Sequence, residues 1–297
     1  MGKKVIVFGG SGFLGSHVAD ALSEKGFEVT LFDLVKSPWA KPTQKMIIGD
    51  IRDFDQVNEA IEGNEIVYHF AGLADLDDAA TRPIETISKN ITGTVNLLEV
   101  AVKQKIDRFV FASTIYVYSA LGGFYRCSKQ SCELYIEEYK KQYNLDFAIL
   151  RFGTLYGPRA NKRNSIWRYL NQGLKTGKIS FPGTGQETRE YIQVKDAANL
   201  SVDILDDKYV NQHIIITGHH PMKVVDMLSM VKEILGRKIE LEFQDSPSEN
   251  HYSITPYSFA PKIGKKLVSD FYTDMGQGIL ECLNELSRES EETKGKD

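Results

Sequence analysis

The spacing of apolar residues divides the first 150 residues into short strand-like runs and longer helical runs. Compact apolar runs predict buried strands, and repeats at helical spacing, such as Leu14, Val18 and Leu22, predict helices. The expected strands are 4–8, 28–32, 45–48, 65–70, 108–112 and 146–150, and the expected helices are 13–25, 54–62, 83–104 and 124–143. Strands that alternate with helices indicate right-handed crossovers and a parallel sheet with helices on both faces.

The alternation breaks after residue 152, where Gly, Pro and Asn become frequent. Expected helices at 165–175, 195–205, 224–235 and 272–286 and expected strands at 212–216 and 239–243 follow. The pattern predicts an α/β fold with a doubly wound parallel sheet in residues 1–152, to which some later segments return. Residues 153–286 are expected to form mainly a smaller α/β substrate lobe, and the charged residues 287–297 a flexible tail.

A glycine-rich turn joins the first expected strand to the first expected helix. Gly9 permits a tight turn, Gly12 lets the backbone approach a pyrophosphate, and Gly15 allows close contact between helix and strand. Free amides at the start of the helix, including those of Phe13 and Leu14, then bind phosphate oxygens. Glycines alone are a weak signal, but this strand and helix context predicts a Rossmann-type dinucleotide site.

Asp33 ends the second strand, eighteen residues after Gly15. A carboxylate there accepts hydrogen bonds from the adenosine ribose and repels a 2′-phosphate, which favours NAD over NADP. The nearby cation Lys36 is the main argument against that preference. Asp50 follows the third strand and either reaches the adenine edge or caps a helix, although Asp53 is the better cap.

A tyrosine and a lysine four residues apart, Tyr125 and Lys129, lie on one face of the expected helix 124–143. A nearby ammonium stabilises a tyrosinate, and the strand end at Ala112–Thr114 can place a hydroxyl beside the phenol. Lowering a tyrosine pKa from about 10 by roughly 3 units takes about 4 kcal/mol. The second pair of this spacing, Tyr191 and Lys195, lies in the later lobe without such a partner, so we expect ordinary structural roles there.

Composition narrows the function classes. The net charge is -4 and no long basic run occurs, which argues against nucleic-acid binding. No apolar stretch reaches the roughly 20 residues of a membrane-spanning helix. The cysteines Cys127, Cys132 and Cys282 are odd in number and match no metal motif, so we expect reduced thiols in a cytoplasmic protein without a metal site.

Taken together, these motifs resemble the extended short-chain dehydrogenase/reductase family, in its NAD-dependent epimerase/dehydratase branch. The resemblance runs over nearly the whole chain and includes Asn90, the segments 111–118 and 150–159, and the segment 183–198. It implies that Thr114 is the catalytic Ser/Thr, that Lys129 also contacts the nicotinamide ribose, and that Arg189 lies near the substrate phosphates. Substrates in this branch are mostly nucleotide-diphosphate sugars.

The motifs and the resemblance give a set of expected site residues. The catalytic set is Thr114, Tyr125 and Lys129, and the substrate set is Thr114, Thr154 and Arg189. The positions expected to bind NAD are Gly9, Gly12, Phe13, Leu14, Gly15, Asp33, Asp50, Ile51, Phe70, Ala71, Gly72, Asn90, Ala112, Ser113, Tyr125 and Lys129.

Three departures from the family pattern affect the expected substrate pocket. Dehydratases follow the catalytic Thr with Asp-Glu, whereas Ile115 and Tyr116 stand here, which disfavours elimination of water. Only ten residues separate Thr114 from Tyr125, where relatives carry a longer loop, and Thr154 replaces a common Asn. These changes leave the nucleotide and the sugar open.

We therefore expect an NAD-dependent nucleotide-sugar 4-epimerase acting in carbohydrate biosynthesis. The alternatives are a one-way 4-dehydrogenase or 4-ketoreductase and, from another class, a cofactor-sensing regulator without chemistry. Relatives pair the two long helices across a two-fold axis, so a homodimer is expected, with Leu97, Val100, Leu134 and Ile136 as its apolar contacts.

Overall fold

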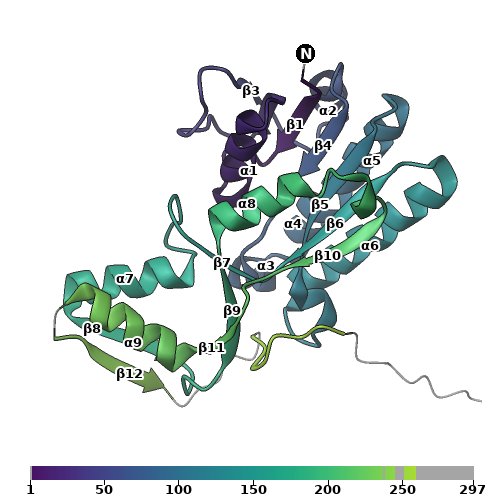
Figure 1. Cartoon of the computed structure of the whole chain (residues 1–297). Coiled ribbons are helices and arrows are strands. Elements are labelled where there is room, and N and C mark those ends of the chain that lie inside the picture. Colours follow the sequence, from purple (N-terminus) through teal and green to yellow (C-terminus); the bar gives the residue numbers. More distant parts are fainter. Residues whose placement is uncertain (1, 237, 245–250, 259–297) are drawn as a thin grey trace, which may run out of the picture. The chain divides into compact units, whose positions relative to one another are not determined.

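Seven parallel strands form the central sheet of the protein, in the order β10-β6-β5-β4-β1-β2-β3 (Figure 1). The structure is a computed structural model and describes residues 2–236, 238–244 and 251–258, all within one compact unit. The strands are β1 (Lys4–Phe8), β2 (Glu28–Asp33), β3 (Lys45–Ile48), β4 (Ile66–His69), β5 (Arg108–Thr114), β6 (Phe147–Phe152) and β10 (Gln212–Ile216). The order reverses direction between β1 and β4, which is where a doubly wound fold binds a dinucleotide. The predicted fold class is confirmed.

Two helical layers cover the two faces of the sheet, because alternate strand residues point to opposite faces. On one face α1 (Phe13–Glu24) packs beside α8 (Val194–Asp203) over Val5, Leu31 and Ala148. The other face is covered by α2 (Phe54–Ile61), α5 (Gly93–Lys103) and α6 (Gly123–Tyr143), whose apolar residues join Ile6 and Phe109. Because α8 and β10 follow residue 152, later segments of the chain do contribute to the Rossmann part.

The segment 83–104 was expected to form one regular α-helix, but it is not regular throughout. The structure divides it into α4 (Pro83–Thr86), a π-helical turn η1 (Ile87–Thr92) and α5, with α3 (Leu76–Thr81) preceding them. Asn90 lies in the π turn, where its side chain contacts two other segments of the chain. Single π turns inside α-helices are rare and are frequently found at functional sites.

The second group of elements contains strands that the apolar pattern does not reveal. These are β7 (Thr154–Tyr156), β9 (Thr188–Gln193) and β11 (Pro221–Lys223) in one small sheet, and β8 (Lys178–Pro182), which pairs with β12 (Glu240–Gln244), the strand expected at 239–243. Beside them, α7 (Ser165–Thr176) and α9 (Val224–Leu235) share a separate apolar core. Short 3-10 turns, η2 (Ile115–Tyr118) and η3 (Asp207–Tyr209), complete the described elements. The expected helix 272–286 and the tail 287–297 lie outside the described residues.

The apolar positions expected at a dimer interface need correction. Leu97, Val100 and Ile136 are buried in the chain's own core, and only Leu134 is exposed. Helical spacing alone does not say which apolar stripe of a helix faces its own sheet.

Two further observations concern the described residues only. No helix there is both long and apolar enough to cross a membrane. Cys127 and Cys132 are free thiols, and no group of three His, Cys, Asp or Glu side chains there could hold a metal ion.

Candidate active site

The glycine turn after β1 packs tightly against neighbouring backbone. Gly9 has a φ of 83°, and a Cβ there would lie 2.6 Å from the amide nitrogen of Ala71, at the end of β4. A Cβ at Gly15 would lie 2.2 Å from the carbonyl oxygen of Gly9. A side chain at either position would displace the turn, so both glycines are required by the packing of β1, α1 and the segment after β4.

The start of α1 is open to a ligand. Gly12 is its N-cap, is exposed, and supplies no side chain that could cap the amides of the first turn. Uncapped amides at a helix N-terminus, together with the helix dipole, bind anions such as phosphate. The residues present at the end of β1 therefore fit the pyrophosphate of a dinucleotide.

Asp33 lies directly beside this turn. Its carboxylate accepts a hydrogen bond of 2.9 Å from the amide of Ser11, and the Ser11 hydroxyl donates to the carbonyl oxygen of Val35 at 2.7 Å. These two bonds hold the end of β2 against the glycine turn. The carboxylate is thereby fixed where the adenosine ribose of a dinucleotide would bind in this fold.

Asp50 and Asp53 differ in their partners. Asp53 caps α2 by accepting hydrogen bonds from the amides of Asp55 and Gln56, so the capping alternative for Asp50 is excluded. The guanidinium of Arg52 hydrogen-bonds the Asp50 carboxylate and holds the pKa of that carboxyl below its usual range. The adjacent Ile51 is buried.

Asn90 connects the segment after β4 to helix α6. Its side-chain amide accepts from the amide of Leu73 at 2.7 Å and donates to the Leu73 carbonyl at 3.0 Å and to the Ser128 hydroxyl at 2.9 Å. A Cβ at Gly72 would lie 2.7 Å from the Asn90 side-chain oxygen. Asn90 therefore positions the segment that includes Phe70, Ala71 and Gly72.

Thr114 and Tyr125 come together where β5 ends and α6 begins. Both side chains are buried, and the Thr114 hydroxyl is hydrogen-bonded to the Tyr125 phenol. Burial raises the pKa of Tyr125 to about 12, and the Thr114 hydrogen bond opposes that rise. A phenol with this pKa is protonated at neutral pH, so further positive charge is needed before it can accept a proton.

Lys129 lies one helical turn after Tyr125 on α6. Its ammonium donates to the carbonyl oxygen of Ala112 at 2.7 Å and lies 5.9 Å from the centre of the Tyr125 ring and 4.6 Å from that of Phe111. Burial lowers the pKa of Lys129 to about 8, so the group remains mostly charged at pH 7. The expected cation is thus near the phenol, but its direct hydrogen bond is to the strand end.

Ser113 points away from Thr114, as neighbouring strand residues do. It is buried, and its hydroxyl donates to the Glu133 carboxylate at 2.5 Å. The Ser113 hydroxyl therefore faces helix α6, so that any contact of Ser113 with the cofactor would involve its backbone. It is also not positioned to replace the Thr114 hydroxyl.

A cavity of about 740 Å³ opens in front of Thr114 and reaches the small sheets. Phe13 of the glycine turn lines one part of it, and the expected substrate residues Thr154 and Arg189 line another. Phe13, Thr114 and the expected substrate residues therefore surround one connected space. Tyr191, for which an ordinary structural role was expected, also lines this cavity.

Several cavity residues have no signal in the sequence motifs. Tyr252 contacts both expected substrate residues. Thr154 hydrogen-bonds its hydroxyl, and the Arg189 guanidinium lies 4.4 Å from its ring centre. Tyr116 hydrogen-bonds His251 at 2.7 Å. Arg168 adds positive charge to the wall, whereas Arg163, also in the wall, pairs with Asp78 at 2.7 Å. The sequence GPRANKRN at 157–164 predicts a loop, but it does not predict that this loop lines the cavity.

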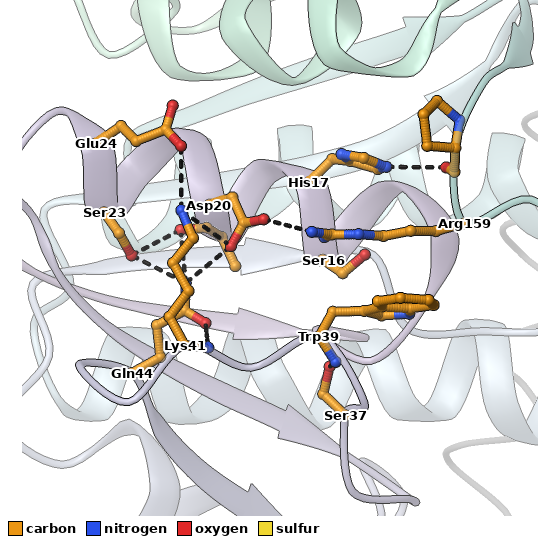
Figure 2. Close-up of polar contacts among 12 residues, drawn as sticks. Ser16, His17, Asp20, Ser23, Glu24, Ser37, Trp39, Lys41, Gln44 and Arg159 are labelled. Carbon is orange, nitrogen blue, oxygen red and sulfur yellow. Dashed lines mark hydrogen bonds and ion pairs between the residues drawn. The ribbon is translucent and has the colours of Figure 1, made fainter.

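A second cluster of polar side chains joins the loop after β7 to helix α1 and to the loop after β2 (Figure 2). Arg159 pairs with Asp20 of α1 at 2.7 Å, and its guanidinium lies 5.1 Å from the ring centre of Trp39. His17 donates to the carbonyl oxygen of Pro158 at 3.0 Å. Arg159 has a φ of 66°, which residues other than glycine seldom adopt. The cluster connects α1, the loop after β2 and the loop that continues to Arg163 in the cavity.

Comparisons with known proteins agree with this arrangement. The chain is 28% identical over 267 residues to a Methanocaldococcus jannaschii protein with the provisional name UDP-glucose 4-epimerase, covering 82% of the chain and 86% of the relative. It is 29% identical over 252 residues to a UDP-N-acetyl-alpha-D-glucosaminuronate decarboxylase of Bacillus cytotoxicus, covering 76% and 78%.

Solved structures share the fold. A Thermus thermophilus UDP-glucose 4-epimerase, in complex with NAD, superposes with a TM-score of 0.77 at 25% identity over 88% of this chain and 95% of the other. A Thermotoga maritima UDP-glucose 4-epimerase gives 0.79 at 24% identity, over 86% and 90%. The sequence profile of the NAD dependent epimerase/dehydratase family matches residues 5–217. The chain belongs to the NAD dependent epimerase/dehydratase family.

Proposed function

We propose that this protein is a nucleotide-sugar 4-epimerase that uses NAD, with Tyr125 as the group that takes and returns the proton of the sugar O4. The observation that carries the proposal is the hydrogen-bonded Thr114–Tyr125 pair, which stands beside Lys129. Thr114 lines a cavity that also reaches the glycine turn. The UDP-sugar epimerases among the similar proteins support the substrate class.

When bound, NAD supplies the hydride acceptor for the sugar C4 and, once reduced, the donor for the return step. Tyr125 takes the hydroxyl proton as the C4–H bond breaks, and Thr114 donates a hydrogen bond to the same oxygen. The C4 carbon becomes a ketone, and Tyr125 returns the proton to the oxygen when hydride is added to the other face. Such acid–base participation contributes about 10²–10⁴-fold to a rate.

Lys129 serves two purposes in this scheme. Its ammonium lies 5.9 Å from the centre of the Tyr125 ring and would stabilise a tyrosinate there. Its hydrogen bond to Ala112 also holds the end of β5 against α6. The positive charge of the oxidised cofactor adds to that of Lys129 in lowering the pKa of Tyr125 from its value of about 12.

Arg189 and Arg168 suit the diphosphate of the substrate. A guanidinium offers several donors in a planar fork that matches phosphate oxygens. Both side chains line the cavity beyond Thr114, and their charge is local on a chain whose net charge is -4. Asp33 favours NAD over NADP, because a carboxylate repels the 2′-phosphate.

The alternatives differ in what happens after the oxidation. A 4-dehydrogenase would use the same residues and release the ketone and the reduced cofactor, whereas a 4-ketoreductase would run the same step in reverse and release the alcohol and NAD. Elimination of water is disfavoured, since Ile115 is fully buried and Tyr116 is engaged with His251. A regulator without chemistry has no need of the buried Thr114–Tyr125 pair.

The first expected result is reversible epimerisation without accumulation of reduced cofactor. The protein would be incubated with UDP-glucose, UDP-galactose, UDP-N-acetylglucosamine or UDP-glucuronic acid, with the sugar followed by chromatography and NADH by absorbance at equimolar enzyme and substrate. Stoichiometric NADH release would instead identify a dehydrogenase. If none of these sugars reacts or raises the melting temperature, UDP-sugars are excluded as the substrates.

We also propose a cytoplasmic homodimer. The free thiols Cys127 and Cys132 support the cytoplasm as the compartment, because thiols stay reduced there. For the dimer, the adjoining helices α4, η1 and α6 expose the apolar residues Ile84, Ile87 and Leu134, the first at 81% and the last at 66%. Burying such a surface against a second copy would remove it from water.

Light scattering at micromolar concentration is expected to give twice the 33.5 kDa mass of the chain. Leu134→Lys should yield the single-chain mass with unchanged circular dichroism, because the side chain is not part of the core. The matched control is Ile234→Lys on α9, which is 72% exposed and distant from these helices in sequence. A monomeric wild-type protein would count against the dimer.

A further inference from the structure

A buried ion pair lies behind the candidate active site. Arg151 of β6 and Glu133 of α6 are each less than one-tenth exposed, and two hydrogen bonds of 3.0 and 2.6 Å join the guanidinium to the carboxylate. Arg151 also hydrogen-bonds the Tyr118 hydroxyl and lies 4.7 Å from that ring's centre. The scheme proposed above assigns no part to this pair.

The position of the pair links it to the reacting groups. Tyr125, Lys129 and Glu133 follow one another at four-residue intervals on α6, so they lie along one face of the helix. Glu133 also accepts the 2.5 Å hydrogen bond from Ser113, the residue before Thr114. The pair is thus attached to both elements that hold the Thr114–Tyr125 hydrogen bond.

The other ionisable groups around Lys129 are uncharged at neutral pH. His69, at the end of β4, is fully buried, and burial holds its pKa well below the usual value. Burial raises the pKa values of the Cys132 thiol and of the Tyr125 phenol, both on α6, above their usual values. Among the described residues that act on Lys129, Glu133 is therefore the one full charge, and Arg151 neutralises it.

We propose that Glu133 and Arg151 are positioning residues that set the electrostatic potential at Lys129 and Tyr125 through two charges that offset each other. The inference rests on the proposed function, because it concerns the proton affinity of the proposed base and its neighbouring cation. Glu133 holds the strand end through its hydrogen bond with Ser113, and its negative charge favours the charged form of Lys129. Arg151 binds the Glu133 carboxylate, so that Glu133 does not form an ion pair with Lys129 instead.

The two charges predict opposite effects when each is removed alone. Glu133→Gln removes the carboxylate and keeps the Arg151 cation, so the pKa values of Lys129 and Tyr125 should both fall. Arg151→Met leaves the Glu133 carboxylate unbalanced beside Lys129, so both pKa values should rise. At an effective dielectric constant of about 20, a full charge about one helical turn away corresponds to a shift of about two pH units.

The test is a pH titration of the Lys129 side chain by NMR in the cofactor-free protein, with lysine labelled at the terminal nitrogen and Lys129→Met used to assign the signal. The wild-type midpoint is expected at about 8. Glu133→Gln should move the midpoint down and Arg151→Met should move it up. The pH dependence of kcat should follow, with its acidic limb shifting in the same two directions.

Two controls separate this role from ordinary structural support. Arg151→Lys keeps the charge, and Glu137→Gln removes a carboxylate one turn further along α6, which pairs with His213 at 2.9 Å nearer the surface. Both should leave the midpoint within a few tenths of a unit. All single variants of the buried pair should melt at lower temperature, so stability alone does not distinguish the roles.

The double variant Glu133→Gln/Arg151→Met keeps the proposal testable if a single variant fails to fold. It removes both charges together and leaves neither buried unpaired, so it is expected to fold and to restore the wild-type midpoint. Shifts in one direction for both single variants, or a shifted double variant, would overturn the inference. Absent NMR shifts reject this inference, whereas undiminished turnover of Tyr125→Phe would reject the proposed base.

Discussion

Replacing Tyr125 by phenylalanine is expected to lower kcat by about 10²–10⁴-fold, the usual contribution of a general acid–base group. The substitution removes the hydroxyl that Thr114 contacts but keeps the buried ring in its place on α6. NAD binding should persist, because the glycine turn and Asp33 lie on other elements. Ser113 is bonded to Glu133 and is not placed to take over the proton.

The measurement is steady-state turnover on the sugar identified by the substrate panel, with NAD affinity measured in parallel. Tyr143→Phe, at the exposed end of the same helix, is the matched control and should behave as the wild type. Near-normal turnover of Tyr125→Phe would mean that another residue is the base. Loss of NAD binding together with turnover would point to a structural defect.

Gly12→Ala is expected to weaken NAD binding by about 10–100-fold while hardly changing the melting temperature. Gly12 has φ -76° and ψ 174°, which alanine adopts readily, and an added Cβ would contact only the Gly9 carbonyl oxygen, at 3.1 Å. The fold therefore tolerates the methyl group, but a pyrophosphate approaching the amides of α1 would meet it. Losing one or two charge-assisted hydrogen bonds costs about that much affinity.

Calorimetric titration with NAD tests this expectation, and the same titration with NADP should give weaker binding because of Asp33. Gly15→Ala is the informative comparison, since its Cβ would lie 2.2 Å from backbone oxygen and should destabilise the fold as well. Unchanged NAD affinity in Gly12→Ala would place the cofactor elsewhere. Tighter binding of NADP than of NAD would overturn the assigned preference.

The Rossmann part could be predicted from sequence because its signals are local. Gly9 and Gly15 are required by contacts with nearby backbone. The strands from β1 to β6 are compact apolar runs, which the sequence shows without knowledge of contacts between distant segments. The same holds for the pairing of Tyr125 with Lys129, which helical spacing places on one face. Their approach to Thr114 follows because β5 leads directly through η2 into α6.

Other parts depend on contacts between distant segments. Asn90 lies in the π turn of a long helix, and its side chain bonds to Leu73 and Ser128, contacts that no helical pattern encodes. The strands β7, β9 and β11 are short and mix polar with apolar residues, so their alternation is weak. His251 and Tyr252 contact Tyr116 in the cavity wall although they follow it by more than a hundred residues, and no sequence motif predicts this contact.

The cluster around Arg159 also gives the protein a built-in optical reporter. The sequence contains two tryptophans, and one of them, Trp39, lies under the Arg159 guanidinium in the loop that follows Asp33. The other, Trp167, is on α7 and does not line the cavity. Trp167→Phe would therefore leave a single emitter next to the adenosine side of the site. Its fluorescence would follow the arrival of NAD at that loop separately from events at the sugar.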